Sequence, residues 1–186
     1  MRSVFVVALL VGGSVGPLAD VPRDPRACPA HQDARSALVG VWRLVALESR
    51  TTSGEIRHPL GRAARGQLMY DSAGRMSAQL MDPDRPTFAS GDLTRGNDAE
   101  LRAAVAGYIA YYGTYTLDPT RGIVTHHVEG ALFPNWVGGD QVRHFRLDGS
   151  RLTITTEPIR IGGEESTTVL AQLPRFSGPD RLYSST

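Results

Sequence analysis

Short apolar runs that alternate with polar residues recur along the chain from about residue 40 to residue 173, and clusters of turn residues separate them. Alternation with a period of two is typical of β-strands that are buried on one face. The pattern predicts strands over residues 41–49, 66–70, 76–81, 111–117, 123–131, 141–147, 151–156 and 167–173. Turn residues at 71–74 and at 148–150 predict two β-hairpins within this series.

One segment departs from the alternation. Asn97 has the character of a helix N-cap, and Asp98 and Glu100 follow in the first turn, where carboxylates complement the helix dipole. Apolar residues then fall at helical spacing on one face, namely Leu101, Ala104, Val105, Tyr108 and Ile109. We therefore expect one helix between the third and fourth strands, with this stripe lying against the wall or mouth of the sheet.

Eight short strands joined mostly by short, sequential connections close well into a barrel, whose interior is filled by side chains or holds one small ligand. We expect an all-β domain over residues 38–175, an eight-stranded antiparallel β-barrel with one inserted α-helix. A Greek-key sandwich is the alternative architecture. The sequential connections favour the barrel.

The N-terminus has the order of a secretory signal peptide over residues 1–19. Arg2 precedes an unbroken apolar run at 4–11 that is too short to span a bilayer, and small residues follow up to Ala19. Export to the periplasm or medium is expected; a mis-assigned start codon before a cytoplasmic protein is the alternative. Residues 20–37 read as a linker that ends in a helical turn from residue 34 to 38, and residues 176–186 as a C-terminal tail.

Composition narrows the classes of function. All 20 basic residues are arginine, which excludes a Schiff-base lysine or a P-loop lysine within the chain. Three arginines and two acidic residues precede residue 31, so 17 arginines then balance 17 acidic residues. This balance favours neither nucleic acid nor an anionic membrane as a partner, and no integral membrane segment is expected beyond the leader. The lone Cys28 makes no internal disulfide.

Several motifs together resemble the bacterial and fungal lipocalin-like domain family, some of whose members are encoded near polyketide biosynthetic genes. They are Gly40-Val41-Trp42, residues 66–70 with 74–81, residues 126–129 leading to 133–138, and residues 141–143. The resemblance covers most of residues 38–175. It implies a lipocalin-like barrel in which Trp42 plugs the closed end, and it supports the fold far more than any activity.

Alternation places Arg143 on the same strand face as Phe145 and Leu147. If that face is inward, a buried guanidinium needs a partner, and we expect Glu129 on the preceding strand to supply it. His127 shares a face with Glu129. These three residues form either one wall of a ligand pocket, in which arginine grips an oxygen and histidine moves a proton, or a structural ion pair with a bonded histidine.

Further candidates for ligand contact are aromatic residues at inward-compatible positions and residues in two loops: Tyr70, Tyr111, Tyr115, Trp136 and Arg85. The tyrosines suit an amphipathic cavity or a filled core, and Trp136 suits a lid or a packing role at a strand end. The adjacent His126 and His127 point to opposite faces of a strand, so we expect no metal site. Phosphate-loop and dinucleotide motifs are absent, and no cofactor is expected.

Three functions remain compatible with the sequence. The first is binding of a small hydrophobic or amphipathic molecule with a carbonyl or carboxylate end. The second is an isomerase or cyclase that acts on a polyketide-like or lipid-derived substrate in the same cavity, with Arg143 or His127 assisting enolisation. The third is a structural barrel with a filled interior. The sequence leaves the oligomeric state open.

Overall fold

The computed structural model describes residues 29–161 and 163–174. The expected leader, Cys28 and the C-terminal tail lie outside these residues, so those predictions stay predictions. The described chain begins with helix α1 (Pro29–Leu38), which is longer than the single turn expected at the end of the linker. Leu38, its last residue, is completely buried and belongs to the core.

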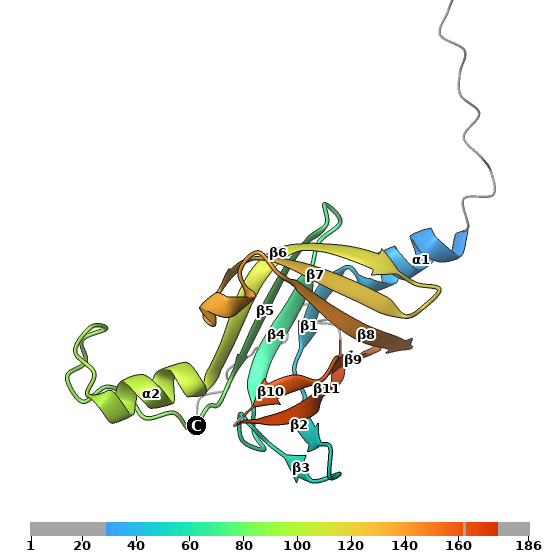
Figure 1. Cartoon of the computed structure of the whole chain (residues 1–186). Coiled ribbons are helices and arrows are strands. Elements are labelled where there is room, and N and C mark those ends of the chain that lie inside the picture. The colour runs from blue at the N-terminus through green and yellow to red at the C-terminus, as the bar shows by residue number, and fades with distance from the viewer. Residues whose placement is uncertain (1–28, 162, 175–186) are drawn as a thin grey trace, which may run out of the picture.

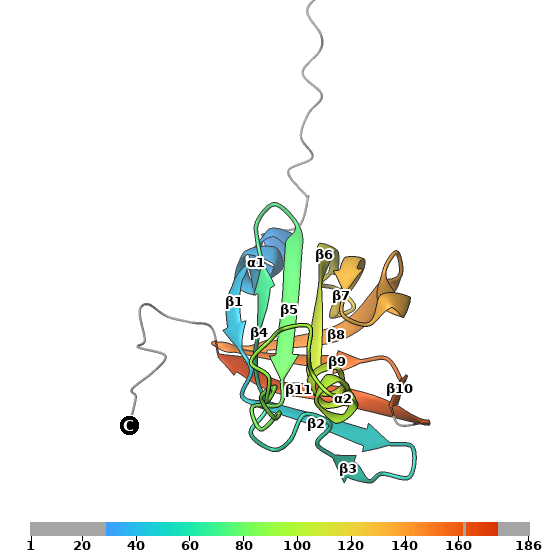
Figure 2. The same ribbon diagram turned by 90° about the vertical axis from the view of Figure 1, so that its left-hand side faces the viewer.

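An antiparallel sheet follows and curls round on itself (Figures 1 and 2). The strands are β1 (Gly40–Arg43), β2 (Ala46–Thr51), β3 (Ile56–Arg57), β4 (Arg65–Tyr70), β5 (Arg75–Met81), β6 (Tyr108–Asp118), β7 (Ile123–Ala131), β8 (Asp140–Asp148), β9 (Arg151–Thr156), β10 (Ile159–Ile161) and β11 (Glu164–Pro174). They pair in the order β1-β4-β5-β6-β7-β8-β9-β11-β2-β3, with β10 added on β11.

The first strand closes this curl. β1 pairs with β4 at one end of the order, while β2, which begins three residues after β1 ends, pairs with β11 at the other end. Together β1 and β2 form one strand that bends at Leu44 and Val45. Its first half pairs with β4 and its second half with β11, so it joins the two edges of the curled sheet. The strands β3 and β10 are short additions to this sheet. When β1 and β2 are counted as one strand, the other strands match the eight expected from the sequence, and the barrel is confirmed.

Both expected hairpins are present. β4 and β5 meet at a turn in which Gly74 has a φ of 90°, and β8 and β9 meet at a turn in which Gly149 has a φ of 57°. Glycine adopts these left-handed backbone angles without the steric cost that a Cβ atom brings. The turn residues therefore fix the register of both strand pairs.

Trp42, which the resemblance implies to plug the closed end of the barrel, lies in the buried core next to the end of α1. Its side chain is 1% exposed, and its indole Nε1 donates a hydrogen bond to the carbonyl oxygen of Leu38 at 2.8 Å. The bond ties the end of α1 to β1. Trp42 also faces Leu68 across the β1–β4 pair, so it packs on the apolar part of the core.

The inserted helix α2 (Asp98–Ala106) lies between β5 and β6, as expected. Its N-cap is a capping box: the Asn97 side chain accepts from the backbone of Glu100, whose carboxylate accepts from the Asn97 backbone. The expected packing of its apolar stripe on the barrel is wrong. The helix ends at Ala106 and none of its residues is buried. The side chains of Leu101 and Val105 are exposed.

The predicted apolar face of the helix was wrong because two of its five residues belong to a strand. Tyr108 and Ile109 open strand β6 and contribute to the sheet rather than to the helix. The segment from Asp82 to Gly107 forms a projecting arm, with α2 standing away from the sheet in Figure 1. Among the described residues no helix is long and apolar enough to cross a membrane.

Candidate functional site

The inner face of β7 decides which residues meet inside the barrel. Val124, His126 and Val128 are buried there, at 0%, 1% and 3% exposure. His127 and Glu129, which directly follow His126 and Val128, point outward because successive side chains of a strand alternate between faces. The two adjacent histidines do lie on opposite faces, and His126 is the one inside.

His126 lies between two tyrosines in the interior. Its Nε2 is 2.7 Å from the hydroxyl of Tyr70 on β4, and its Nδ1 is 3.0 Å from the hydroxyl of Tyr111 on β6. Tyr70 is 1% exposed and Tyr111 is 7% exposed. A three-residue chain of hydrogen bonds therefore spans the interior from β4 to β7 to β6.

More aromatic rings extend this chain. Tyr115 on β6 packs edge-on against Tyr70 with ring centres 4.9 Å apart, and it donates a hydrogen bond to the backbone oxygen of Asp71. Trp136, in the short 3-10 helix η1 (Pro134–Trp136), packs edge-on against Tyr111 at 5.5 Å. The three tyrosines predicted from the sequence thus share the interior, and the partly buried Trp136 borders it.

Arg143 on β8 is also inside and only 5% exposed. Its terminal nitrogens donate to the backbone oxygen of Val142 and to Oε1 of Gln141, each at 2.9 Å. Within the part of the chain that the structure describes, no carboxylate lies within ion-pair distance of it. Arg143 is therefore an interior cation whose protein partners are all neutral.

The expected pairing of Arg143 with Glu129 is wrong. Glu129 lies on the outer face and binds the guanidinium of Arg75 on β5 through two hydrogen bonds of 2.7 and 2.8 Å. His127 is also outside, where Nδ1 is 2.7 Å from Oδ1 of Asp140 and Nε2 is 3.0 Å from the hydroxyl of Thr116. Neither Glu129 nor His127 reaches the interior cluster.

Burial sets the protonation states in the cluster. It lowers the pKa of His126 to about 3, and the positive charge of Arg143 adds to this effect. Burial also raises the pKa of the Tyr70 and Tyr111 hydroxyls, against the opposing influence of Arg143. At neutral pH the histidine is therefore uncharged and both tyrosines are protonated, which leaves Arg143 as the charged member of the cluster.

Hydroxyl groups continue the polar surface beyond Arg143. Thr156 on β9 lies opposite Arg143 in the strand register and accepts a hydrogen bond from the backbone of Thr168 on β11. Thr168 in turn faces Ser49 on β2, with their hydroxyls 3.5 Å apart. Thr156, Thr168 and Ser49 are all buried, so they form a row of hydroxyl groups inside the barrel. The part of the interior around Trp42 is apolar.

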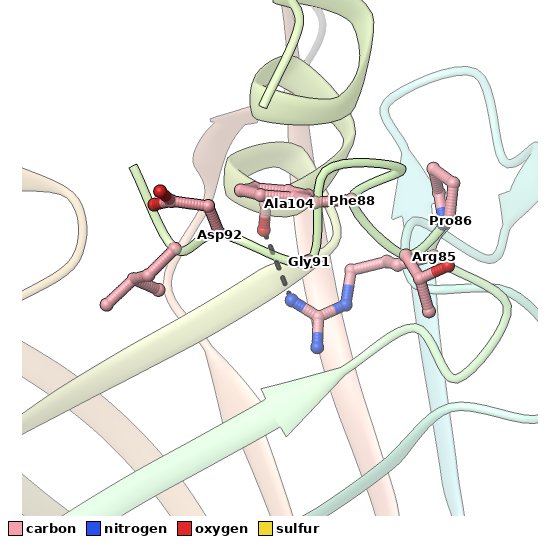
Figure 3. A pocket seen from close by; sticks show the side chains of 8 residues that line it. Arg85, Pro86, Phe88, Gly91, Asp92 and Ala104 are labelled. Atoms are coloured by element: carbon pink, nitrogen blue, oxygen red, sulfur yellow. Dashed lines mark hydrogen bonds between the residues drawn. The ribbon is translucent and has the colours of Figure 1, made fainter. Parts of the chain in front are cut away.

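Arg85 lies away from this cluster, in the projecting arm. Its guanidinium donates to the backbone oxygens of Asp82 and Ala104 and stacks over the ring of Tyr108, 4.9 Å from the centroid. A groove of about 520 Å³ lies beside it; the residues that line it include Pro86, Phe88, Leu93 and Ala104 (Figure 3). These contacts give Arg85 a structural role that joins the arm to β6.

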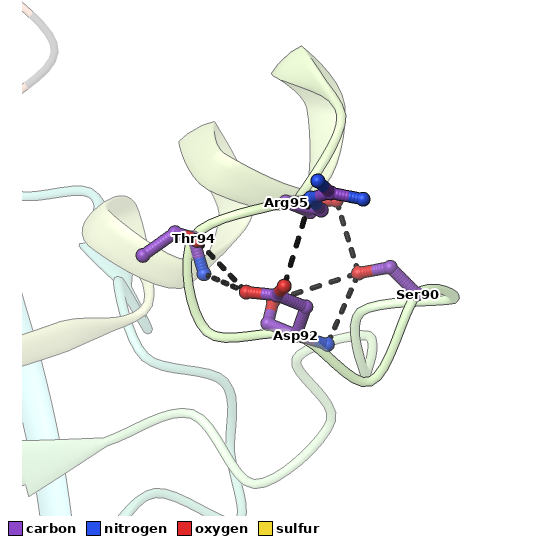
Figure 4. A network of polar contacts seen from close by, with 4 residues as sticks. All are labelled: Ser90, Asp92, Thr94 and Arg95. Carbon is purple, nitrogen blue, oxygen red and sulfur yellow. Dashed lines mark hydrogen bonds and ion pairs between the residues drawn. The ribbon is translucent and has the colours of Figure 1, made fainter.

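The tip of the arm is held by its own polar contacts (Figure 4). Oδ1 of Asp92 accepts from both the backbone nitrogen and the hydroxyl of Thr94, and Ser90 donates to the backbone oxygen of Arg95. The loop side chains thus satisfy one another. Among the described residues, no three His, Cys, Asp or Glu side chains converge as metal ligands would.

Sequence reasoning missed His126, although a signal for it exists. Val124 and Val128 are apolar positions two residues on either side of His126, whereas the opposite face carries Thr125, His127 and Glu129. Alternation therefore marked His126 as the inward histidine. Alternation does not show which side chains bond to His126, because Tyr70 and Tyr111 are 56 and 15 residues away on other strands.

A family profile matches most of the described chain. The profile of the lipocalin-like domain family matches residues 39–173. The 4'-hydroxy-3'-methoxypropiophenone carrier protein of Aspergillus oryzae is 35% identical over 112 residues, which cover 55% of this chain and all of that protein. A lipocalin-like protein from Bacteroides uniformis aligns in three dimensions with 15% identity and a TM-score of 0.39, over 75% of this chain and 99% of its own.

Proposed function

Because the chain belongs to the lipocalin-like domain family, we propose that it binds a small, largely apolar molecule inside its barrel and holds the carbonyl or carboxylate end of that molecule at Arg143. The observation that carries the proposal is the buried guanidinium without a carboxylate partner. A charge removed from water is costly unless an opposite charge or strong acceptors surround it. A ligand oxygen supplies such an acceptor.

The surroundings of Arg143 suit a flat ligand with polar groups. Tyr70, Tyr111 and Tyr115 present ring faces and edges, and Trp136 packs at the border of the cluster. Ligand sites are typically apolar and aromatic with a few polar groups that fix orientation. The hydroxyl row from Thr156 to Ser49 adds polar contacts on the opposite side of Arg143.

The fungal relative supports the ligand class. Its name describes a carrier of an aryl ketone, a molecule with an aromatic ring, a ketone oxygen and a phenolic hydroxyl. Such a molecule combines the apolar body and oxygen end that the interior of this barrel suits. We therefore propose that an aryl ketone or a molecule of similar shape is the ligand of this chain as well.

The alternative, an isomerase or cyclase in the same cavity, has weaker support. Enolisation needs a general base with a pKa near the working pH. His127 lies on the outer face, and a pKa of about 3 makes His126 a poor base at neutral pH. The residues around Arg143 therefore favour retention of a ligand over its conversion.

Replacing Arg143 by methionine is expected to weaken binding of 4'-hydroxy-3'-methoxypropiophenone roughly tenfold to a hundredfold, because one charge-assisted hydrogen bond of about 1.5–3 kcal/mol is lost. Methionine fills a similar length with an apolar side chain, and it removes a buried charge that has no carboxylate partner. The variant should therefore fold. Isothermal titration of the full chain measures the dissociation constant.

The matched control is Arg75→Met, which removes an exposed arginine from the outer face and should leave the affinity unchanged. Equal affinities for the wild type and Arg143→Met would contradict the proposal. Native mass spectrometry of protein purified from its own host supplies a second readout. A co-purifying small molecule, present on the wild type and depleted on Arg143→Met, is the expected result.

A further inference from the structure

The hydrogen bonds among Tyr70, His126 and Tyr111 leave one phenolic O–H donor without an acceptor. A neutral imidazole has one N–H group and one bare nitrogen, so His126 donates to one tyrosine and accepts from the other. The tyrosine that receives the histidine proton still has its own O–H. Whichever tautomer is present, one phenolic O–H of Tyr70 or Tyr111 has no protein acceptor among the described residues.

The electrostatic surroundings of that O–H are positive. The titratable groups inside the cluster are Tyr70 from β4, Tyr111 and Tyr115 from β6, His126 from β7 and Arg143 from β8, while β9 contributes the neutral Thr156. At the Tyr115 end, Arg35 of α1 lies over the ring at 5.6 Å, and the carboxylate of Asp71, which is not buried, accepts from the backbone of Arg75. None of the buried groups is negative at neutral pH. A buried donor and a buried cation, with no buried anion, are the groups that stabilise an oxygen on which negative charge resides.

We infer that the barrel binds the ionised form of an acidic phenol or enol, with its oxyanion held by Arg143 and by the unmatched phenolic O–H of the Tyr70–His126–Tyr111 chain. This inference rests on the proposed function and narrows it: the ligand oxygen at Arg143 is an ionised phenol or enol oxygen rather than the oxygen of a neutral carbonyl. The neutral phenol gives up its proton to solvent on binding, and the O–H bond is the one that breaks. His126 does not take this proton, because its pKa is already about 3.

The test uses 4'-hydroxy-3'-methoxypropiophenone and its methyl ether, 3',4'-dimethoxypropiophenone, which cannot ionise. The phenolate of a para-acyl phenol absorbs at longer wavelength than the phenol, so absorbance against pH reports the pKa of the free and the bound compound. We expect the pKa of the bound phenol to lie roughly one to three units below that of the free compound, as an opposite charge at short range produces.

Arg143→Met should abolish most of this lowering, and Arg75→Met should preserve it. Isothermal titration near pH 7, in buffers of different ionisation enthalpy, should show proton release with the phenol and none with the ether. A bound phenol that titrates at or above its free pKa, or a lowering that survives in Arg143→Met, would overturn the inference and leave the proposed function intact. Failure of both compounds to bind would instead reject the proposed function and the inference with it.

Discussion

Acidification from pH 7 to pH 4 is expected to cost the wild-type protein roughly 3 kcal/mol of unfolding free energy through His126 alone. The folded-state pKa of this buried histidine is about 3, against 6.5 for an ordinary histidine. Between these values the unfolded chain binds a proton that the folded chain excludes, so stability falls as the pH falls. The contribution is fully present above about pH 6.5 and is lost progressively towards pH 3.

Urea unfolding of wild type and His126→Gln at pH 7 and pH 4 measures this effect. The variant is expected to be less stable at pH 7 but to lose less on acidification. Acidification also protonates exposed carboxylates with a lowered pKa, such as Glu100 and Asp118. The resulting loss of stability is the same in both proteins, so it cancels in the comparison. Thr125→Ala, next to His126 in the chain but on the outer face, removes no titratable group and should keep the wild-type acid sensitivity. Equal acid losses in His126→Gln and wild type would show that His126 is not buried neutral.

Replacing Trp42 by alanine is expected to lower the free energy of unfolding by about 3–5 kcal/mol. The substitution leaves a cavity where the indole is 1% exposed, and it deprives the carbonyl oxygen of Leu38 of its donor. Domains of this size are stable by only about 5–15 kcal/mol, so the variant should unfold at much lower urea concentration.

Val45→Ala is the matched control for this substitution. Val45 lies three residues away at the bend between β1 and β2, is 47% exposed, and should cost less than about 1 kcal/mol. A loss of under about 1.5 kcal/mol for Trp42→Ala would contradict the view that this side chain closes the barrel end. Intrinsic fluorescence is unsuitable for the comparison because it changes with Trp42 itself, so circular dichroism should follow unfolding.

The strands and hairpins were predictable because their signals are local. Alternation over five to ten residues marks a half-buried strand, and the turn residues before Arg75 and Arg151 mark where the chain reverses. The capping box at Asn97 is likewise contained within four residues. These features required no knowledge of which strands become neighbours.

The end of the helix was misjudged because an apolar stripe does not show where a helix stops. Gly107 directly follows the last helical residue and donates its N–H to the carbonyl oxygen of Ala103. Glycine at that position is a common stop signal, and Tyr108 beyond it already pairs with Met81 in the sheet. The apolar residues on the two sides of Gly107 thus serve two different elements.

The partners of charged residues were not predictable, because pairing depends on the folded sheet. Glu129 and Arg75 are 54 residues apart and lie on strands separated by β6, yet their side chains meet on the outer face. The sequence correctly indicated that Arg143 shares a face with core residues. Whether Glu129 would share that face could not be predicted, and it lies on the outer face with Arg75.

A crystal structure of the protein in complex with 4'-hydroxy-3'-methoxypropiophenone would show whether Arg143 holds the ligand. We expect the ligand to lie inside the barrel, with an oxygen within hydrogen-bonding distance of Arg143 and of the Tyr70 or Tyr111 hydroxyl. A ligand seated in the groove beside Arg85, or anywhere outside the barrel while Arg143 keeps only its contacts to Gln141 and Val142, would contradict it.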